Sequence, residues 1–98
     1  LMTVYVGTNS DTVVANGALL DMCLDVASHS PEGFAWGGRG LGPSQLACAI
    51  MVNEYGRDLK SHPLHYQKLK EELISKIKGS SFTITSEDVM RVINSNAK

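Results

Sequence analysis

The residues best suited to chemistry lie in one short stretch, which reads WGGRGLGPSQ from Trp36 to Gln45. Its glycines lead directly into Pro43, which suits the first position of a helix because a missing N–H costs nothing there. A glycine-rich turn before a helix presents unpaired backbone N–H groups and roughly half a positive charge, which together attract anions. We therefore expect an anion-binding site at this turn.

Side chains in the same stretch can extend the site toward a phosphorylated small molecule such as a nucleotide. Arg39, Ser44 and Gln45 supply hydrogen-bond donors, and Trp36 supplies a flat ring on which a base can stack. The candidate ligand-binding residues are Trp36, Gly38, Arg39, Gly40, Gly42, Ser44 and Gln45. Neither GxxxxGK[ST] nor a GxGxxG in a βαβ unit is present. The alternative is a tight, purely structural turn whose glycines let a buried helix pack against a sheet.

Histidine and cysteine give no recognisable catalytic or metal-binding pattern. His62 and His65 lie three residues apart near an expected helix start, but no carboxylate or cysteine stands beside them. Cys48 falls in an expected buried helix, where a thiol lacks the exposure that a nucleophile needs. Neither a G-x-S-x-G sequence nor a glycosidase-like pair of carboxylates is present. We therefore expect a protein without catalytic activity, metal or cofactor.

Length and charge narrow the class of protein. Ninety-eight residues suit one domain, residues 1–98, and the net charge of −1 gives no electrostatic basis for binding nucleic acid. No apolar run approaches the roughly 18 residues that a membrane span needs, and the start shows no signal peptide. Cys23 and Cys48 are far apart and are expected to be reduced, buried thiols. These features predict a cytoplasmic protein that binds no membrane.

Around the glycine-rich turn, the sequence predicts a short strand on one side and a buried helix on the other. The strand is Phe34–Trp36. The helix begins at Pro43, runs to about Tyr55 and ends at Gly56, a favourable residue just past a helix end. Because nearly every position in this helix is apolar, we expect it to lie at the centre of the molecule.

The N-terminal third predicts a three-stranded antiparallel meander. Residues 3–8 alternate as a strand, and the Asn16-Gly17 pair is the strongest hairpin signal in the chain. Residues 21–29 leave two alternatives open, namely a further strand, or one helical turn followed by a loop.

The C-terminal third predicts an amphipathic helix from Pro63 to Gly79, with charged residues on its solvated side. A short strand at residues 82–84 follows, and Thr85-Ser86-Glu87-Asp88 has the form that starts helices. The expected fold class is therefore α+β. A small antiparallel β-sheet packs around a buried central helix and a second amphipathic helix, with a short C-terminal helix.

The stretch SPEGFAWGGRGLGPSQLACAIM resembles a family of small, functionally uncharacterised proteins from microbes and their mobile elements. Their shared stretch reads approximately SPtGFeWGYgGSGPaqLAlAiL. The residues that match are Ser30, Pro31, Gly33, Phe34, Trp36, Gly37, Gly40, Gly42, Pro43, Gln45, Leu46, Ala47, Ala49 and Ile50. Gly38, Arg39 and Leu41 stand where the family has Tyr, Gly and Ser, so a ligand role that depends on those hydroxyls does not carry over. The resemblance implies the fold and brings no established activity.

Two functions remain open from the sequence. The first is a non-catalytic binding protein that takes a phosphorylated small molecule at the glycine-rich turn. The family context extends this to sequestering a nucleotide signal, which would make the protein an inhibitor of host defence. The second is a protein–protein interaction or inhibitor module with a purely structural glycine loop. The apolar helix in so short a chain also favours a homodimer.

Overall fold

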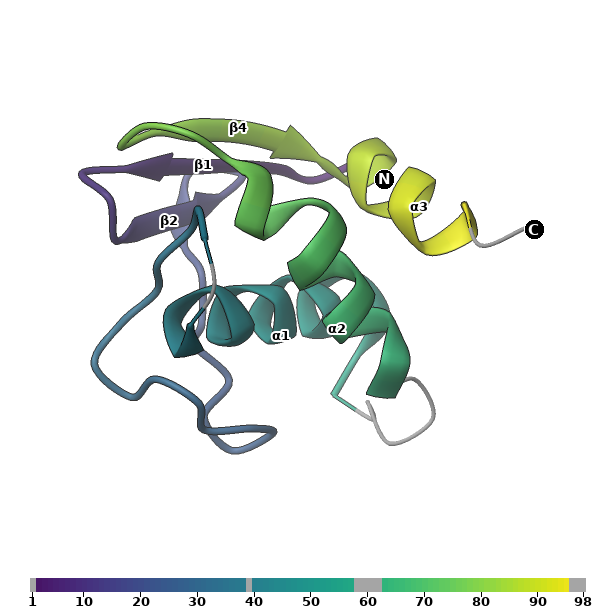
Figure 1. Ribbon diagram of the computed structural model, residues 1–98, viewed down its shortest axis with the longest axis horizontal. Coiled ribbons are helices and arrows are strands. Elements are labelled where there is room, and N and C mark those ends of the chain that lie inside the picture. Colours follow the sequence, from purple (N-terminus) through teal and green to yellow (C-terminus); the bar gives the residue numbers. More distant parts are fainter. Residues whose placement is uncertain (1, 39, 58–62, 96–98) are drawn as a thin grey trace.

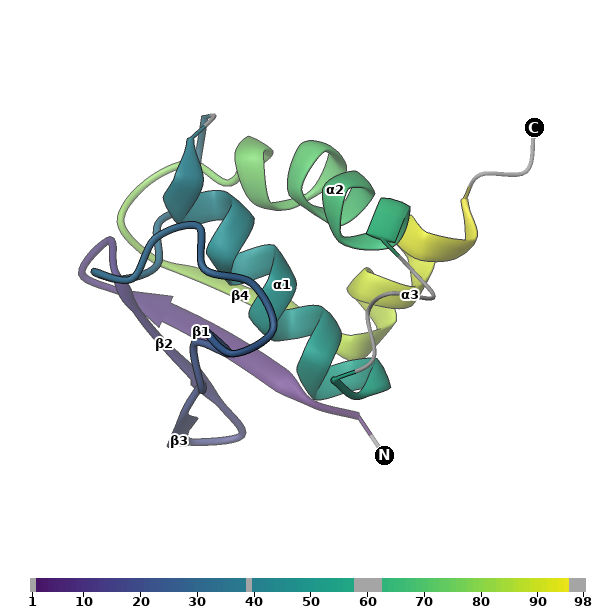
Figure 2. The same cartoon turned by 90° about the horizontal axis from the view of Figure 1, so that it is seen from below.

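Within the residues that the computed structural model describes (2–38, 40–57 and 63–95), four strands form one antiparallel sheet. The strands are β1 (Val4–Thr8), β2 (Thr12–Ala15), β3 (Ala18–Leu19) and β4 (Phe82–Thr85), in the spatial order β3-β2-β1-β4 (Figures 1 and 2). The predicted meander is confirmed. Asn16 and Gly17 have φ values of 51° and 86°, the left-handed conformation that such a hairpin turn requires.

The predicted central helix is confirmed as α1 (Leu41–Tyr55), which crosses beneath the sheet (Figure 2). Every residue from Pro43 to Val52 is buried, as expected for a helix without a polar side. The helix ends as predicted, with the Gly56 N–H donating to the Val52 carbonyl at 2.8 Å. The predicted start at Pro43 is wrong by two residues. Gly40, at φ 142°, makes the turn, so Leu41 and Gly42 are already helical.

The second helix is shorter than predicted. The helix α2 covers Pro63–Glu72, and a separate 3-10 turn, η2, covers Ile74–Lys76, so the prediction of one helix to Gly79 is wrong beyond Glu72. The chain leaves the helical path at Leu73, where φ is −126°. Beyond this break, the carbonyls of Ile74 and Ser75 in η2 accept hydrogen bonds from the N–H groups of Gly37 and Gly38 in the glycine loop.

The prediction of a strand at Phe34–Trp36 is also wrong, because this segment joins no ladder. The segment passes beneath the sheet as irregular backbone, and the N–H groups that follow it, of Gly37 and Gly38, donate to carbonyls of η2 and not to a strand. Its rings are still buried, Phe34 at 7 % and Trp36 at 9 % exposed. For residues 21–29, the sequence left open a strand or one helical turn followed by a loop, and the structure shows a turn and a loop. Leu24–Val26 form a turn closed by the Val26 N–H on the Cys23 carbonyl at 3.0 Å, and a loop follows.

The C-terminal helix α3 (Ser86–Asn94) follows β4 directly, as predicted. The Thr85 hydroxyl accepts the Asp88 N–H, and the Asp88 carboxylate accepts the Thr85 N–H at 2.9 Å, a complete capping box. Because α3 packs on α2, all three helices lie on one side of the sheet (Figure 1). The molecule therefore has two layers, as the α+β prediction required.

Candidate functional site

The backbone N–H groups at the start of the glycine loop bind the protein itself. Gly37 N–H donates to the Ile74 carbonyl at 3.0 Å, and Gly38 N–H donates to the Ser75 carbonyl at 2.7 Å. A Cβ atom on Gly37 would lie 2.7 Å from the Ile77 carbonyl oxygen, so glycine is required for this approach. Two of the donors expected to face an anion therefore hold η2 in place.

Trp36 belongs to the core. Its indole N–H donates to the Gly79 carbonyl at 3.1 Å, and its ring meets that of Phe82 edge to face, with 4.7 Å between the centroids. Both rings pack over Gly7 in β1, where a Cβ atom would overlap the Phe82 ring. The indole is thus held between the sheet and the turn after η2, with little of its face open to a base.

Gln45 is fully buried, and its amide is fully used. Its Oε1 accepts the backbone N–H groups of His29 at 2.7 Å and of Ser30 at 3.0 Å. Its Nε2 donates to the carbonyls of Met22 at 2.7 Å and of Ala27 at 2.8 Å. These four bonds satisfy the amide and fasten the loop of residues 22–30 to α1.

Ser44 is likewise engaged, because its hydroxyl donates to the Gly40 carbonyl at 3.2 Å and its side chain is buried. Gly42 packs against Ala35, whose Cβ would lie 2.5 Å from a Cβ atom added at Gly42. Gly38 and Gly40 are exposed, and Arg39 lies outside the described residues. Of the described residues in the predicted site, the exposed ones are therefore Gly38 and Gly40, directly before α1, whose N-terminus no side chain caps.

A polar cluster that sequence reasoning missed joins β1, α1 and α3. Glu54 accepts hydrogen bonds from the hydroxyls of Tyr5 at 2.6 Å and Ser86 at 2.7 Å, and Asn53 donates to Tyr5 at 2.9 Å. Burial, and then the Glu54 carboxylate, raise the pKa of Tyr5 well above its ordinary value of 10.0. Tyr5 and Ser86 are buried and both hydroxyls donate to Glu54, so the cluster anchors β1 and α3 to α1. No sequence spacing signals it, because the partners are 32 and 49 residues apart.

A groove of about 340 Å³ lies beside the C-terminal half of α1. Its lining residues are Leu20, Asp21, Cys23, Ala49, Val52, Asn53 and Arg57. The Arg57 guanidinium is bound to both oxygens of Asp25, at 2.9 and 2.5 Å, which lowers the pKa of that carboxyl. Burial raises the pKa of the Cys23 thiol, so it stays protonated and is a poor nucleophile.

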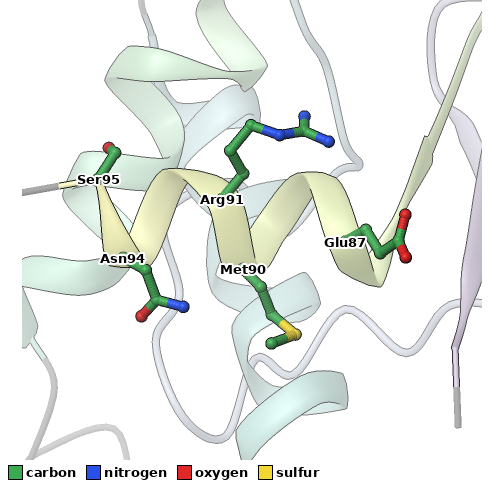
Figure 3. Close-up of a pocket in the computed structure, with 5 residues that line it drawn as sticks. All are labelled: Glu87, Met90, Arg91, Asn94 and Ser95. Carbon is green, nitrogen blue, oxygen red and sulfur yellow. The ribbon is translucent and has the colours of Figure 1, made fainter.

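A second, shallow hollow of about 440 Å³ lies over the exposed side of α3. Figure 3 shows the side chains that line it, which are Glu87, Met90, Arg91, Asn94 and Ser95. They point in different directions and do not converge on one position, and Arg91 is already paired with Asp88 at 2.9 Å. This hollow therefore lacks the convergent polar groups of a small-molecule site.

Of the three histidines, only the side chain of His29 lies in the described part of the chain. His29 Nε2 lies 2.6 Å from the Tyr66 hydroxyl and ties the loop to α2. His62 lies outside the described residues, and nothing is described of the His65 side chain. Among the described residues, no three side chains of His, Cys, Asp or Glu are grouped to hold a metal ion.

One side of the sheet is left uncovered by the described residues, and its composition is unusual. Tyr5, Val13 and Ile84 are buried toward α1, so the residues that alternate with them point away from the helices. We call these the outer sheet face: Val4, Val6, Thr8, Thr12, Val14, Leu19, Thr83 and Thr85. The register places Leu19, Val14, Val6 and Thr83 in one row across the four strands. None of these eight residues is charged, and carboxylates border the face where Thr12 donates to Asp11 at 3.1 Å and Thr85 donates to Asp88 at 3.3 Å.

The comparisons with known proteins identify a family and no function. A family model described as a family of unknown function (DUF6166) matches residues 5–95. No curated protein and no solved structure matches the chain. None of the helices in the described ranges has the length and apolar character of a membrane span.

Proposed function

The chain belongs to the family of unknown function DUF6166, and we propose that it is a non-catalytic protein–protein interaction module whose glycine loop is structural. The observation that carries this proposal is the contrast between two surfaces. At the glycine loop, the polar groups of Trp36, Ser44 and Gln45 are bonded within the protein. On the other side of the sheet, the outward strand residues are uncharged and have no covering layer among the described residues.

The composition of the outer sheet face supports a role in binding protein. An antiparallel sheet that faces water on one side normally alternates apolar and polar residues. Here the outward positions are Val, Thr and Leu, although the chain contains 19 charged residues, nine basic and ten acidic. Leu19 is 78 % exposed at the edge of this face. Depletion of charge with exposed aliphatic side chains is typical of the centre of an interface.

The experiment compares two exposed leucines of similar accessibility. Leu19 is 78 % exposed on the outer sheet face, and Leu41 is 63 % exposed beside the glycine loop. Tagged wild type, Leu19→Lys and Leu41→Lys are used to capture proteins from cells of the native host. We expect a set of proteins bound by wild type and Leu41→Lys and lost with Leu19→Lys. Loss with Leu41→Lys alone would contradict the proposal.

A second candidate function is binding of a phosphorylated small molecule, such as a nucleotide signal sequestered from host defence. One observation favours it. The start of α1 is exposed at Gly40 and Leu41, has no side-chain cap and contains no acidic residue, so no side chain of this turn neutralises the positive end of the helix. The cytoplasmic location expected from the composition and the mobile-element origin that the resemblance implies belong to this candidate as well.

A further inference from the structure

We propose that the groove beside the C-terminal half of α1 is a binding site for a small organic cation, namely a primary ammonium group on a short aliphatic chain. None of the residues that line this groove belongs to the outer sheet face. The inference therefore goes beyond the proposed function, and the two can succeed or fail separately.

The charges around the groove favour a cation. The Arg57 guanidinium uses Nε and Nη2 for a two-point bond to the Asp25 carboxylate, at 2.9 and 2.5 Å. Its distance to the Asp21 carboxylate, 3.7 Å, is too long for a hydrogen bond. Among the described residues, Asp21 thus has no hydrogen-bonded cation. Because two carboxylates stand against one guanidinium, a ligand of positive charge complements the groove and an anion does not.

Two oxygen acceptors at the groove are held in place by the protein. Asp21 Oδ1 accepts the Cys23 N–H at 3.0 Å, which fixes the carboxylate and leaves Oδ2 for a ligand. The Tyr5 hydroxyl donates to Glu54 at 2.6 Å, so it can only accept from Asn53. Asn53 must then turn its NH₂ group toward Tyr5, and its Oδ1 is kept as an acceptor. Asp21, after β3, and Asn53, in α1, both line the groove and can bind an ammonium group.

The rest of the groove suits an aliphatic chain. Leu20, Ala49 and Val52 form its apolar lining. Its volume of about 340 Å³ lies at the small end of the range for ligand sites. At roughly 30 Å³ for each water-sized group, the groove holds a ligand of about ten non-hydrogen atoms. An alkylammonium ion can place its charge beside Asp21 and its chain against these three side chains.

Amide NMR spectroscopy of the full chain tests the site with n-pentylammonium, n-pentanol and n-pentanoate, which differ in charge and share an apolar chain. We expect n-pentylammonium to shift the signals of Ala49, Val52 and Asn53 saturably, with a dissociation constant of about 1 to 10 mM. Binding of n-pentanol should be at least about fivefold weaker, and n-pentanoate should cause no saturable shift. If n-pentylammonium causes no saturable shift up to about 50 mM, or if either other probe binds as tightly, the inference is overturned.

Asp21→Asn identifies the carboxylate that binds the cation. This variant keeps an oxygen to accept the Cys23 N–H and removes the charge, so n-pentylammonium should bind at least about fivefold more weakly. The matched control is Asp11→Asn, which removes an exposed carboxylate outside the groove and should bind like wild type.

Circular dichroism verifies the fold of both variants. Unchanged binding by folded Asp21→Asn, or equal weakening in Asp11→Asn, would overturn the inference. If Asp21→Asn does not fold, the comparison of the three probes on wild type still decides. Capture of host proteins through Leu19 tests the proposed function separately, because the Leu19 substitution alters no residue of the groove.

Discussion

The side-chain oxygen of Gln45 accepts the backbone N–H of His29 at 2.7 Å, across 16 residues of chain. A polar residue in the middle of the core helix thereby fixes the long connection that returns beneath the sheet. By sequence, Gln45 was a candidate to bind a ligand. Its actual partners are four backbone groups of the protein's own loop, which accounts for a glutamine at a fully buried position.

Replacing Gln45 should therefore destabilise the fold strongly. In Gln45→Leu the side-chain volume is nearly kept, but four backbone groups of residues 22–30 lose their partner. We expect the free energy of unfolding to fall by about 3 kcal/mol, since unsatisfied polar groups cost about 1–3 kcal/mol each when buried and the loop can recover part of this from water. Urea denaturation measures the change.

The matched control for this change is Gln67→Leu, at an exposed position of α2. There the free energy of unfolding should change by less than about 0.5 kcal/mol, as for most surface substitutions. Equal effects at the two positions would show that the Gln45 amide does not anchor the loop.

Two neighbouring glycines separate backbone strain from steric contact. Gly37 and Gly38 both have φ of 77°, so alanine at either position pays a similar left-handed penalty. A Cβ atom at Gly37 meets the Ile77 carbonyl at 2.7 Å, and one at Gly38 meets nothing within 4 Å. Gly37→Ala should therefore be less stable than Gly38→Ala by about 2 kcal/mol. Thermal unfolding of the two variants compares them directly. A larger loss in Gly38→Ala would mean that the loop is not packed against η2 as described.

The pH dependence of stability follows from two buried groups. Burial raises the pKa of Cys48 from 9.0 to about 11, and burial with the Glu54 carboxylate raises that of Tyr5 above 10.0. Both groups are neutral when protonated, so a raised folded-state pKa adds stability that is fully present below the unfolded value. This stability is lost as pH rises through the window above about 9.

We expect the free energy of unfolding, measured by urea denaturation, to fall steadily above about pH 9. Cys48→Ala should flatten the part of the fall between about pH 9 and about pH 11, since no thiol is then left in the core helix to ionise. A wild-type profile that stays level to about pH 11 would contradict this assignment.

The phosphate-binding candidate makes a separate prediction, because its remaining donors are backbone groups at the start of α1. If the glycine loop is structural, nucleotides and cyclic nucleotides at about 1 mM should raise the melting temperature by less than about 1 °C. A larger shift that is absent with the unphosphorylated nucleosides would favour the phosphate-binding candidate over the interaction module.

Much of the fold could be predicted because its signals are local. Asn16 and Gly17 readily adopt the positive φ values that their hairpin turn requires. Thr85 and Asp88, three residues apart, cap α3, and Gly56 ends α1. The wrong predictions concern segments whose structure depends on contacts with residues far away in the sequence. Phe34–Trp36 buries its rings in the core without pairing with a strand, and the glycine loop after it bonds the η2 carbonyls beyond the end of α2.

In the candidate site too, local features could be predicted from the sequence and long-range contacts could not. The helix start beside the glycines was predicted to within two residues. The hydrogen-bond partners of Trp36 and Gln45 lie 15 to 43 residues away in the sequence, so no local motif could predict them. The outer sheet face did leave a signal. Val4, Val6 and Val14 alternate with buried residues, where a solvated sheet would have polar side chains.

Site-specific photo-crosslinking in cells of the native host tests most directly whether the outer sheet face, rather than the glycine loop, is the binding surface. A photoreactive benzoylphenylalanine replaces either Leu19 or Leu41, both largely exposed, and covalent adducts are identified by mass spectrometry. The proposed function predicts protein adducts from position 19 and few from position 41. Adducts that form chiefly from position 41, or none from position 19, would contradict it.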